Sequence, residues 1–415
     1  MYSRLINLWD DARSSFWFVP GLMMLAATVA AFGIVQFDAT VGQTLLEEYT
    51  VLNLSPPSAR SILSAIVGAI VTSTGVVFSM TIVALSLASS NFGSRLIRTY
   101  RNRRSTHFTL GIFVGTSLFC ILVLACIRET ENYSFVPVTA VGVGILLTII
   151  CLTTLVFYIH DISNAIQAPN VIQSSAQDLD RAIERLFPSQ IGEPDADAAS
   201  NSSPQSIDLN KSVISIDSDR VGYVQKIENE TIMDLAIEHE IVIKLEVQPG
   251  DFVYEPCQIA EVFAASTSMA ELDGDALEDF KQKVRDCLSV GFNRTPKQDI
   301  RYAFNELVEI AVRALSPGIN DPYTAITCID RIQAALFDLK HRNAPSSHRI
   351  DEESNVLRVI ADPVTLEDCI DESLGMIAGY VEGNPKVKAR LQKAFDDLGY
   401  RQIGELDSSD SDSVA

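Results

Sequence analysis

Four long apolar stretches without a single Asp, Glu, Lys or Arg constrain the fold of this chain more than any other feature. A helix needs roughly 20 residues to cross a hydrocarbon core of about 30 Å, and an amphipathic soluble helix would carry a polar stripe. The sequence therefore predicts a membrane α-helical domain over residues 1–160. Its four transmembrane helices are expected at about 16–37, 62–90, 108–127 and 135–159.

The charge of the chain changes sign at the end of the fourth stretch. Residues 1–160 contain nine Arg, no Lys and seven acidic residues, a net charge of +2. The whole chain carries −21, so the remainder carries −23. This split excludes a single soluble globule, and the acidic part lacks the clustered cations that bind nucleic acid. We expect a membrane domain followed by an acidic soluble region.

The short loops between the predicted spans differ in their Arg content. The loop between the second and third spans is rich in Arg, whereas the other two loops have one each, at an edge. Positively charged loops stay on the cytoplasmic side, so both chain termini are predicted to be cytoplasmic. The loop arginines would act as a topological signal or bind anionic lipid headgroups of the bilayer. They are Arg95, Arg98, Arg101, Arg103 and Arg104.

The second span is longer than one crossing requires, since about 29 helical residues would extend about 43 Å. It also carries small and hydroxylated residues at steps of three, four and seven, which places them on one helical face. We name this face the small-residue seam. Its members are Ser64, Gly68, Thr72, Gly75, Ser79, Ser86 and Ser90. Two interpretations stay open: the seam packs against another helix, or it lines a path through an oligomer.

The residues that follow the fourth span predict a helix and then a linker. A connecting helix is expected over 161–187, bent or broken at Pro169. The tract 188–206 is rich in Pro, Ser, Asp and Asn and has little to bury, which predicts a flexible linker. The last residues, 405–415, predict a disordered acidic tail.

The acidic region between linker and tail predicts an α+β fold. Short alternating apolar runs over 207–263 indicate strands, with a turn at Pro249-Gly250. This turn is similar to those of biotinyl/lipoyl-like domains, so we expect a small β-barrel-like domain. Apolar residues at helical spacing over 270–404 predict a helical domain.

The densest group of polar residues lies in the predicted helical domain. Thr295 with Pro296 and Gln298 reads as a capping box at the start of one helix. Asp321, followed by Pro, reads as the cap of the next. The surrounding polar residues are expected to meet at one end of a helical hairpin. They are Arg294, Asp299, Arg301, Arg313, Asn320 and Asp321. They would form either a capped hairpin with buried ion pairs or an anion-binding pocket.

Motifs for catalysis and metal binding are missing from the sequence. Seven Cys form no CxxC pair, five His are scattered, and no P-loop, GxGxxG, GxSxG or HExxH motif occurs. We therefore expect no enzyme activity, no cofactor and no metal site.

The stretch RTPKQDIRYAFNELVEIAVRALSPGINDPYTA (294–325) resembles the signature of a bacterial membrane-protein family called domain of unknown function 2254. Segments 78–98, 157–163 and 249–253 are similar to the same family in the same order. The resemblance implies several spans and a location in the bacterial cell inner membrane. It implies no activity, so it assigns no catalytic residue.

Two functions from different classes fit these features. The first is a homo-oligomeric channel or transporter-like pore along the second span, regulated by the cytosolic domain. The second is a membrane-anchored scaffold or sensor whose cytosolic part binds a partner or ligand. The position of the small-residue seam distinguishes them. A seam around a central axis would favour the pore, whereas a seam packed against the other spans of the same subunit would favour the scaffold.

Overall fold

The structure is a computed structural model of the chain. It describes residues 17–42, 55–93, 104–130, 133–187, 214–264, 274–351 and 353–400. It divides into an N-terminal unit (Met1–Val171) and a C-terminal unit (Ile172–Ala415), and each unit is described by itself. Several predicted features lie outside the described residues. They are Arg95, Arg98, Arg101, Arg103, the 188–206 linker and the 405–415 tail.

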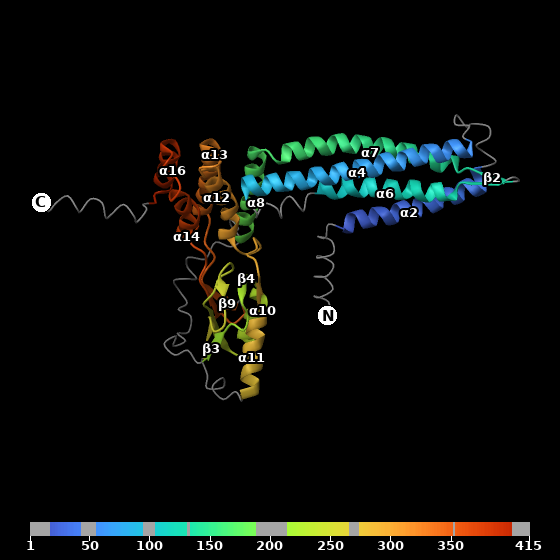
Figure 1. The fold of residues 1–415 in the computed structure, drawn as a ribbon. Coiled ribbons are helices and arrows are strands. Elements are labelled where there is room, and N and C mark those ends of the chain that lie inside the picture. Colours follow the sequence, from blue (N-terminus) through green and yellow to red (C-terminus); the bar gives the residue numbers. More distant parts are fainter. Residues whose placement is uncertain are drawn as a thin grey trace. The chain divides into compact units, whose positions relative to one another are not determined.

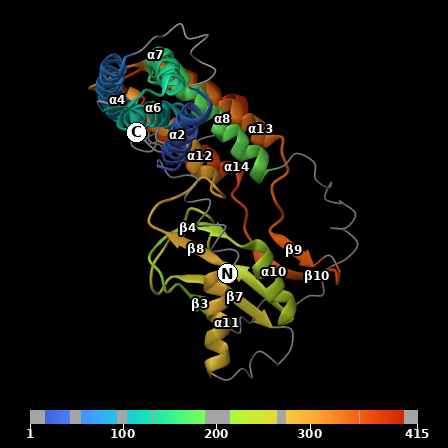
Figure 2. The same ribbon diagram turned by 90° about the vertical axis from the view of Figure 1, so that its right-hand side faces the viewer.

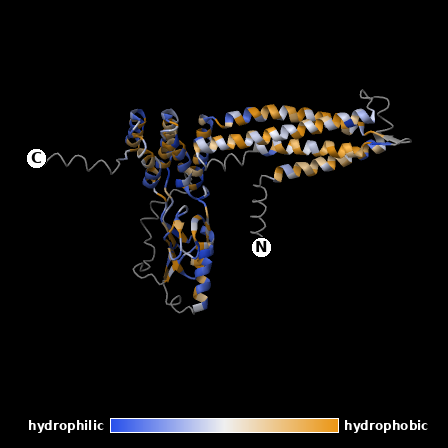
Figure 3. Cartoon of the chain, viewed as in Figure 1, coloured by the Kyte–Doolittle hydropathy of each residue, from blue (hydrophilic) through white to orange (hydrophobic). Residues whose placement is uncertain are grey.

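The N-terminal unit is a bundle of four long helices that run side by side (Figure 1). All four are long and apolar enough to cross a membrane, and they lie where the four spans were predicted. Their apolar character is visible along their whole length (Figure 3). The helices are α2 (Phe18–Phe37), α4 (Pro56–Phe92), α6 (Arg104–Cys126) and α7 (Val138–Ala165).

Helix α6 forms the centre of this bundle. It packs against α2, α4 and α7, and it is the most buried of the four helices. Phe119 of α6 is buried in one apolar cluster with Leu63 of α4 and Val141 of α7. The exposed apolar surface of the unit therefore belongs mostly to the three outer helices, as expected for a bundle whose outer faces contact lipid.

Short elements join the helices of the bundle. The π-helical turn η1 (Asp38–Gly42) continues α2. Strands β1 (Arg128–Thr130) and β2 (Tyr133–Phe135) form an antiparallel hairpin before α7. The fourth helix therefore begins at Val138, slightly later than the predicted span.

Helix α8 (Ala168–Leu186) follows α7 after a two-residue break. Pro169 lies in the first turn of α8, where its missing N–H costs no helical hydrogen bond. The predicted break near Pro169 is thus present, just before the proline.

The strands of the C-terminal unit form two open sheets. Among the described residues no barrel is closed, so the predicted small β-barrel-like domain is wrong. The five-stranded sheet has the order β3 (Ile214–Asp217), β7 (Gln258–Ala264), β5 (Ile241–Leu245), β10 (Val356–Ala361), β9 (His348–Asp351). The three-stranded sheet has the order β6 (Phe252–Val253), β4 (Gly222–Ile227), β8 (Leu288–Gly291).

The sheets use strands from both halves of the C-terminal unit. Strand β10 pairs with β5 in parallel, although more than a hundred residues separate them. The prediction that 270–404 is purely helical is therefore wrong, because β8, β9 and β10 lie there. Short apolar runs such as Val356–Ala361 do not distinguish strand from helix by periodicity alone. The local turn at Pro249-Gly250 is present, but a turn does not determine how distant strands pair.

Two helices cover the core of the β region (Figure 2). Helix α10 (Asn229–Glu238) contributes Ile232 and helix α11 (Gly274–Asp286) contributes Phe280. Both side chains are buried in one cluster with Ile243 of β5 and Val359 of β10. The remaining helices are α12 (Ile300–Ala314), α13 (Pro322–Lys340), α14 (Leu366–Ile370), η3 (Asp371–Gly375), α15 (Met376–Ala378) and α16 (Pro385–Leu398).

The start of α12 differs from the prediction. Its N-cap is Asp299, whose side chain accepts a hydrogen bond from the Tyr302 N–H, and not Thr295. The predicted capping box is wrong because its residues bind strand β4 instead. Thr295 Oγ1 donates to the Gln225 carbonyl, and Gln298 hydrogen-bonds the backbone of Ile227 in both directions.

Candidate functional site

The small-residue seam of α4 faces away from the rest of the N-terminal unit. All seven seam residues are exposed in the single chain. The buried residues of α4 lie on the opposite face, about 180° around the helix at 100° per residue. They are Ala59, Leu63, Ile70, Val77, Ala84, Ala88 and Phe92. The seam thus does not pack against α2, α6 or α7 of the chain.

The two glycines of the seam face open space. A Cβ atom at Gly68 or Gly75 would meet no atom within 4 Å. The Thr72 hydroxyl donates to the Gly68 carbonyl in its own helix, which leaves its oxygen lone pairs outward. Larger exposed side chains border the seam, Phe78 and Ile82 among them. A second helix or a column of water would fit between these borders.

Helix α4 is also longer than a bilayer crossing requires. Its 37 residues extend about 55 Å at 1.5 Å per residue, against a hydrocarbon core of about 30 Å. The seam spans Ser64 to Ser90, so it continues past the length of one crossing. Of the predicted basic loop, the structure describes Arg104, the first residue of α6.

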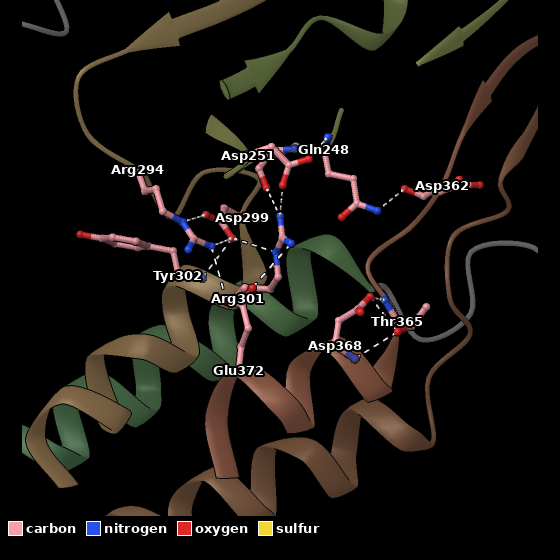
Figure 4. A network of polar contacts seen from close by, with 11 residues as sticks. Gln248, Asp251, Arg294, Asp299, Arg301, Tyr302, Asp362, Thr365, Asp368 and Glu372 are labelled. Carbon is pink, nitrogen blue, oxygen red and sulfur yellow. Dashed lines mark hydrogen bonds and ion pairs between the residues drawn. The ribbon is translucent and has the colours of Figure 1, made fainter. Parts of the chain in front are cut away.

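The polar residues at the start of α12 form a tight ion network (Figure 4). Arg294 binds Asp299 through two parallel contacts, Nε to Oδ2 at 2.7 Å and Nη2 to Oδ1 at 3.0 Å. The Asp299 side chain is 1 % exposed and also caps α12. Burial lowers the pKa of the Arg294 guanidinium, but the hydrogen bonds and charge of Asp299 outweigh it and hold that pKa above its ordinary value.

Arg301 connects this pair to two other segments. Its Nη2 donates to the Pro249 carbonyl at 3.1 Å and to Asp251 Oδ1 at 2.9 Å. Its Nη1 lies 3.6 Å from Glu372 of η3. The network therefore joins the 249–251 turn of the β region to α12 and η3. Two arginines face three carboxylates, so the cluster neutralises its own cations and leaves none for an external anion.

The other half of the predicted cluster lies at the far end of α12. Helix α12 has fifteen residues and is about 22 Å long. Arg301 and Arg313 lie near its opposite ends. Arg313 pairs with Glu309, Asn320 has a positive φ of 49°, and Asp321 caps α13 as predicted. The six residues thus form two groups, and both groups cap and clamp helices. The prediction that the six residues meet at one end of a helical hairpin is therefore wrong, because α12 separates the two groups.

Metal-ligating and thiol side chains occur in the described residues. No group of three or more His, Cys, Asp or Glu in the described residues is placed to hold a metal ion. The cysteines in the C-terminal unit are partly or fully buried, and burial raises the pKa of the Cys287 thiol to about 11 and that of Cys369 to about 12. Thiols with such high pKa values are poor nucleophiles.

Sequence reasoning missed one polar residue of the bundle. Asp38, the first residue of η1, is 4 % exposed. Its Oδ2 accepts the Ala140 N–H of α7 at 3.1 Å, and its Oδ1 has no hydrogen-bond partner among the described residues. A carboxylate directly after an apolar span is a signal for such a contact, because buried charges occur in membranes only with partners.

Comparison with known proteins places the chain in a family. Two curated relatives, uncharacterised proteins of Mycobacterium bovis and Mycobacterium tuberculosis, are each 26 % identical over 358 residues. Each match covers 86 % of this chain and 66 % of the relative, so the chain spans just under two thirds of their length. No solved structure matches the chain. Residues 13–397 match a family described as predicted membrane protein, and the chain therefore belongs to this family, DUF2254.

Proposed function

We propose that this protein is a homo-oligomeric membrane pore whose α4 helices face one another across a central path. The observation that carries the proposal is the outward position of the small-residue seam, opposite the face of α4 that packs inside the subunit. The C-terminal unit would regulate passage from the cytoplasm. The location is the bacterial inner membrane with both termini cytoplasmic, which rests on the Arg-rich loop at 95–104.

Physical chemistry favours a protein or water contact for the seam over a lipid contact. Lipid tails gain little from glycine, whereas small residues let helix backbones approach closely and let hydroxyls bond across the contact. The neighbouring spans present larger apolar residues to their surroundings, such as Phe32 on α2 and Phe157 on α7. On α4 the exposed small and hydroxylated residues form one continuous face from Ser64 to Ser90.

The hydroxyl content of the seam favours a path for water or ions over a dry helix contact. Four of its seven members are serines and one is a threonine. Pores do not require formal charges, because hydroxyl groups can replace part of the hydration shell and apolar constrictions can gate by dewetting. Phe78 and Ile82 beside the seam would supply such a constriction.

The test compares two matched glycine substitutions in the full chain. Gly75→Leu fills the seam, and Gly33→Leu makes the same change on α2, where a Cβ also meets no atom within 4 Å. Each protein is examined by light scattering in detergent and by ion flux in liposomes under voltage, tension and pH gradients. We expect an oligomer with flux that Gly75→Leu abolishes and Gly33→Leu retains.

Two results would contradict the proposal. A monomeric protein without ion flux would contradict both the oligomer and the pore. An oligomer that depends on Gly75 but carries no flux under any condition would retain the seam as a packing surface and favour the scaffold.

A further inference from the structure

A cavity of about 620 Å³ opens in the C-terminal unit and adjoins the ion network of α12 at Pro249 and Ile300. Its floor is the sheet surface that carries Leu245 of β5 and Ala361 of β10. The end of α8 at Phe187 and the start of α12 at Ile300 form further walls. Because Leu245, Phe187 and Ile300 are buried, these walls are fixed parts of the fold. The volume falls within the range of about 300–1,000 Å³ that is usual for small-molecule sites.

Arg349 lines this cavity, and among the described residues no carboxylate forms an ion pair with it. It lies on β9, the edge strand of the five-stranded sheet (Figure 2), and pairs in register with Val359. Residues paired in register project from the same sheet face, which is the face bearing the core residue Val359. The buried Nε of Arg349 has no hydrogen-bond partner among the described residues. Burial lowers the pKa of this guanidinium, and no neighbouring carboxylate opposes the shift.

Other arginines of the C-terminal unit differ from Arg349. Arg294, Arg301 and Arg342 each bind a carboxylate. Arg358 of β10 also has a buried Nε without a hydrogen-bond partner in the described part of the chain, but its charge acts on Asp351 and it does not line the cavity. A desolvated guanidinium without a partner is costly, and a bound anion would remove that cost.

The charges around the cavity favour an anion over a cation. Arg185 also lines it and donates to the Pro296 carbonyl at 2.7 Å. Asp362 is the carboxylate among the lining residues, so the lining carries two positive charges and one negative charge. This balance is positive in a chain whose net charge is −21. The planar fork of an arginine binds phosphate and carboxylate through two parallel hydrogen bonds.

The apolar walls identify the rest of the ligand. Ile227, Leu245 and Val247 line the cavity and are 5 %, 5 % and 7 % exposed. A bare inorganic ion would leave these surfaces in contact with water, whereas an apolar or aromatic group would cover them. We propose that this cavity binds a small organic anion, with its phosphate or carboxylate group on Arg349 and its apolar body on the β5 and β10 surface. The site is independent of whether α4 lines a pore.

The proposal is tested by calorimetric titration of the full chain in detergent with three probes. The probes are phenyl phosphate, benzoate and inorganic phosphate. We expect inorganic phosphate to bind at least about tenfold more weakly than the better of the two aromatic anions. The difference between phenyl phosphate and benzoate identifies the anionic group.

Two substitutions of Arg349 and one control substitution of Arg358 test whether Arg349 binds the anion. Arg349→Met should weaken binding by about tenfold or more, because charge-assisted hydrogen bonds are lost. Arg358→Met is the matched control, a neighbouring arginine outside the cavity, and should bind as the unmodified protein does. Arg349→Lys keeps the positive charge but cannot donate two parallel hydrogen bonds, so it should also weaken binding. This variant tests the site if Arg349→Met does not fold.

Three results would overturn the proposal. The first is that none of the probes binds. The second is that the unmodified protein, Arg349→Met and Arg358→Met bind the probes with equal affinity. If Arg349→Met does not fold, the same conclusion follows from equal affinities of the unmodified protein and Arg349→Lys. The third is equal affinity for inorganic phosphate and both aromatic anions, which would exclude the organic body.

Discussion

Replacing Gly250 by Ala should disrupt the ion network of α12 through a single added methyl group. Gly250 lies in the turn between β5 and β6 and has a φ of 100°. A Cβ atom there would lie 2.3 Å from Asp299 Oδ2 and 3.0 Å from Arg294 Nη2. Side chains rarely adopt this backbone conformation, and no real Cβ contact is as short as 2.3 Å, so either the turn or the ion pair must move.

The expected loss in the free energy of unfolding is the sum of two terms. A non-glycine residue at positive φ loses about 1–2 kcal/mol, and forcing extra volume into a packed site costs about 1–3 kcal/mol. Asp299 is 1 % exposed and held by Arg294 through two contacts, so it has little freedom to retreat. The free energy of unfolding should fall by about 2–5 kcal/mol. For a unit of this size, that corresponds to a melting temperature about 5–15 °C lower.

The assay is thermal unfolding of the purified full chain in detergent, followed by intrinsic fluorescence. Gly318→Ala is the matched control, because a Cβ there meets no atom within 4 Å and its φ is not positive. We expect Gly318→Ala to leave the melting temperature unchanged. If Gly250→Ala melts within about 1 °C of that control, the turn does not rest on the ion pair and the reasoning is refuted.

Three further substitutions test other contacts. Arg301→Met leaves Asp251 without its cation, while Asp299 and Glu372 keep Arg294, and it should lower the free energy of unfolding by about 3 kcal/mol. Chemical denaturation that shows no loss would indicate that the contacts of Arg301 are redundant. Asp321→Ala should cost about 1 kcal/mol near neutral pH, because the hydrogen bond from the Thr324 hydroxyl, followed by backbone N–H groups, holds the pKa of Asp321 below its ordinary value. A lowered carboxyl pKa stabilises the fold above the unfolded pKa of about 3.9. The difference in free energy of unfolding between the two proteins should therefore vanish as the pH falls through the lower folded pKa. A difference that persists at the lowest pH in urea titrations would contradict this assignment. Asp38→Ala removes the acceptor of the Ala140 N–H and should lower the stability to heat in detergent by about 1 kcal/mol. Asp38→Asn keeps an acceptor oxygen and should lose less stability. Equal losses of stability in the two variants would argue against the contact.

Features that depend on nearby residues were predictable from the sequence. The four apolar helices follow from length and charge alone, since a bilayer-spanning helix satisfies its own backbone. Asp321 followed by Pro322 was recognised as a helix start because capping is a local interaction. Helices α12 and α13 lie in the region where apolar residues at helical spacing predicted helices, and each buries one face.

Features that depend on distant residues were not predictable. The cap of α12 moved from Thr295 to Asp299 because β4 offers Thr295 a partner. The barrel prediction failed because β10 inserts between β5 and β9, a pairing that no local pattern encodes. Arg349 received no functional interpretation, since its lack of a counter-charge arises only when β9, β10 and the end of α8 meet around one cavity.

The stretch that resembles the family signature has a structural explanation that redirects the search for function. Arg294, Asp299 and Arg301 clamp the β region to α12, and Asp321 caps α13. Arg294 and Asp299 satisfy each other through two hydrogen bonds, and Arg301 pairs with Asp251, although the buried Nε of Arg301 has no hydrogen-bond partner among the described residues. These contacts shape the C-terminal unit. Function is then to be sought where interactions are left incomplete. Two such places stand out among the described residues: the outward seam of α4, whose seven residues are exposed, and the cavity lined by Arg349, whose buried Nε has no hydrogen-bond partner there.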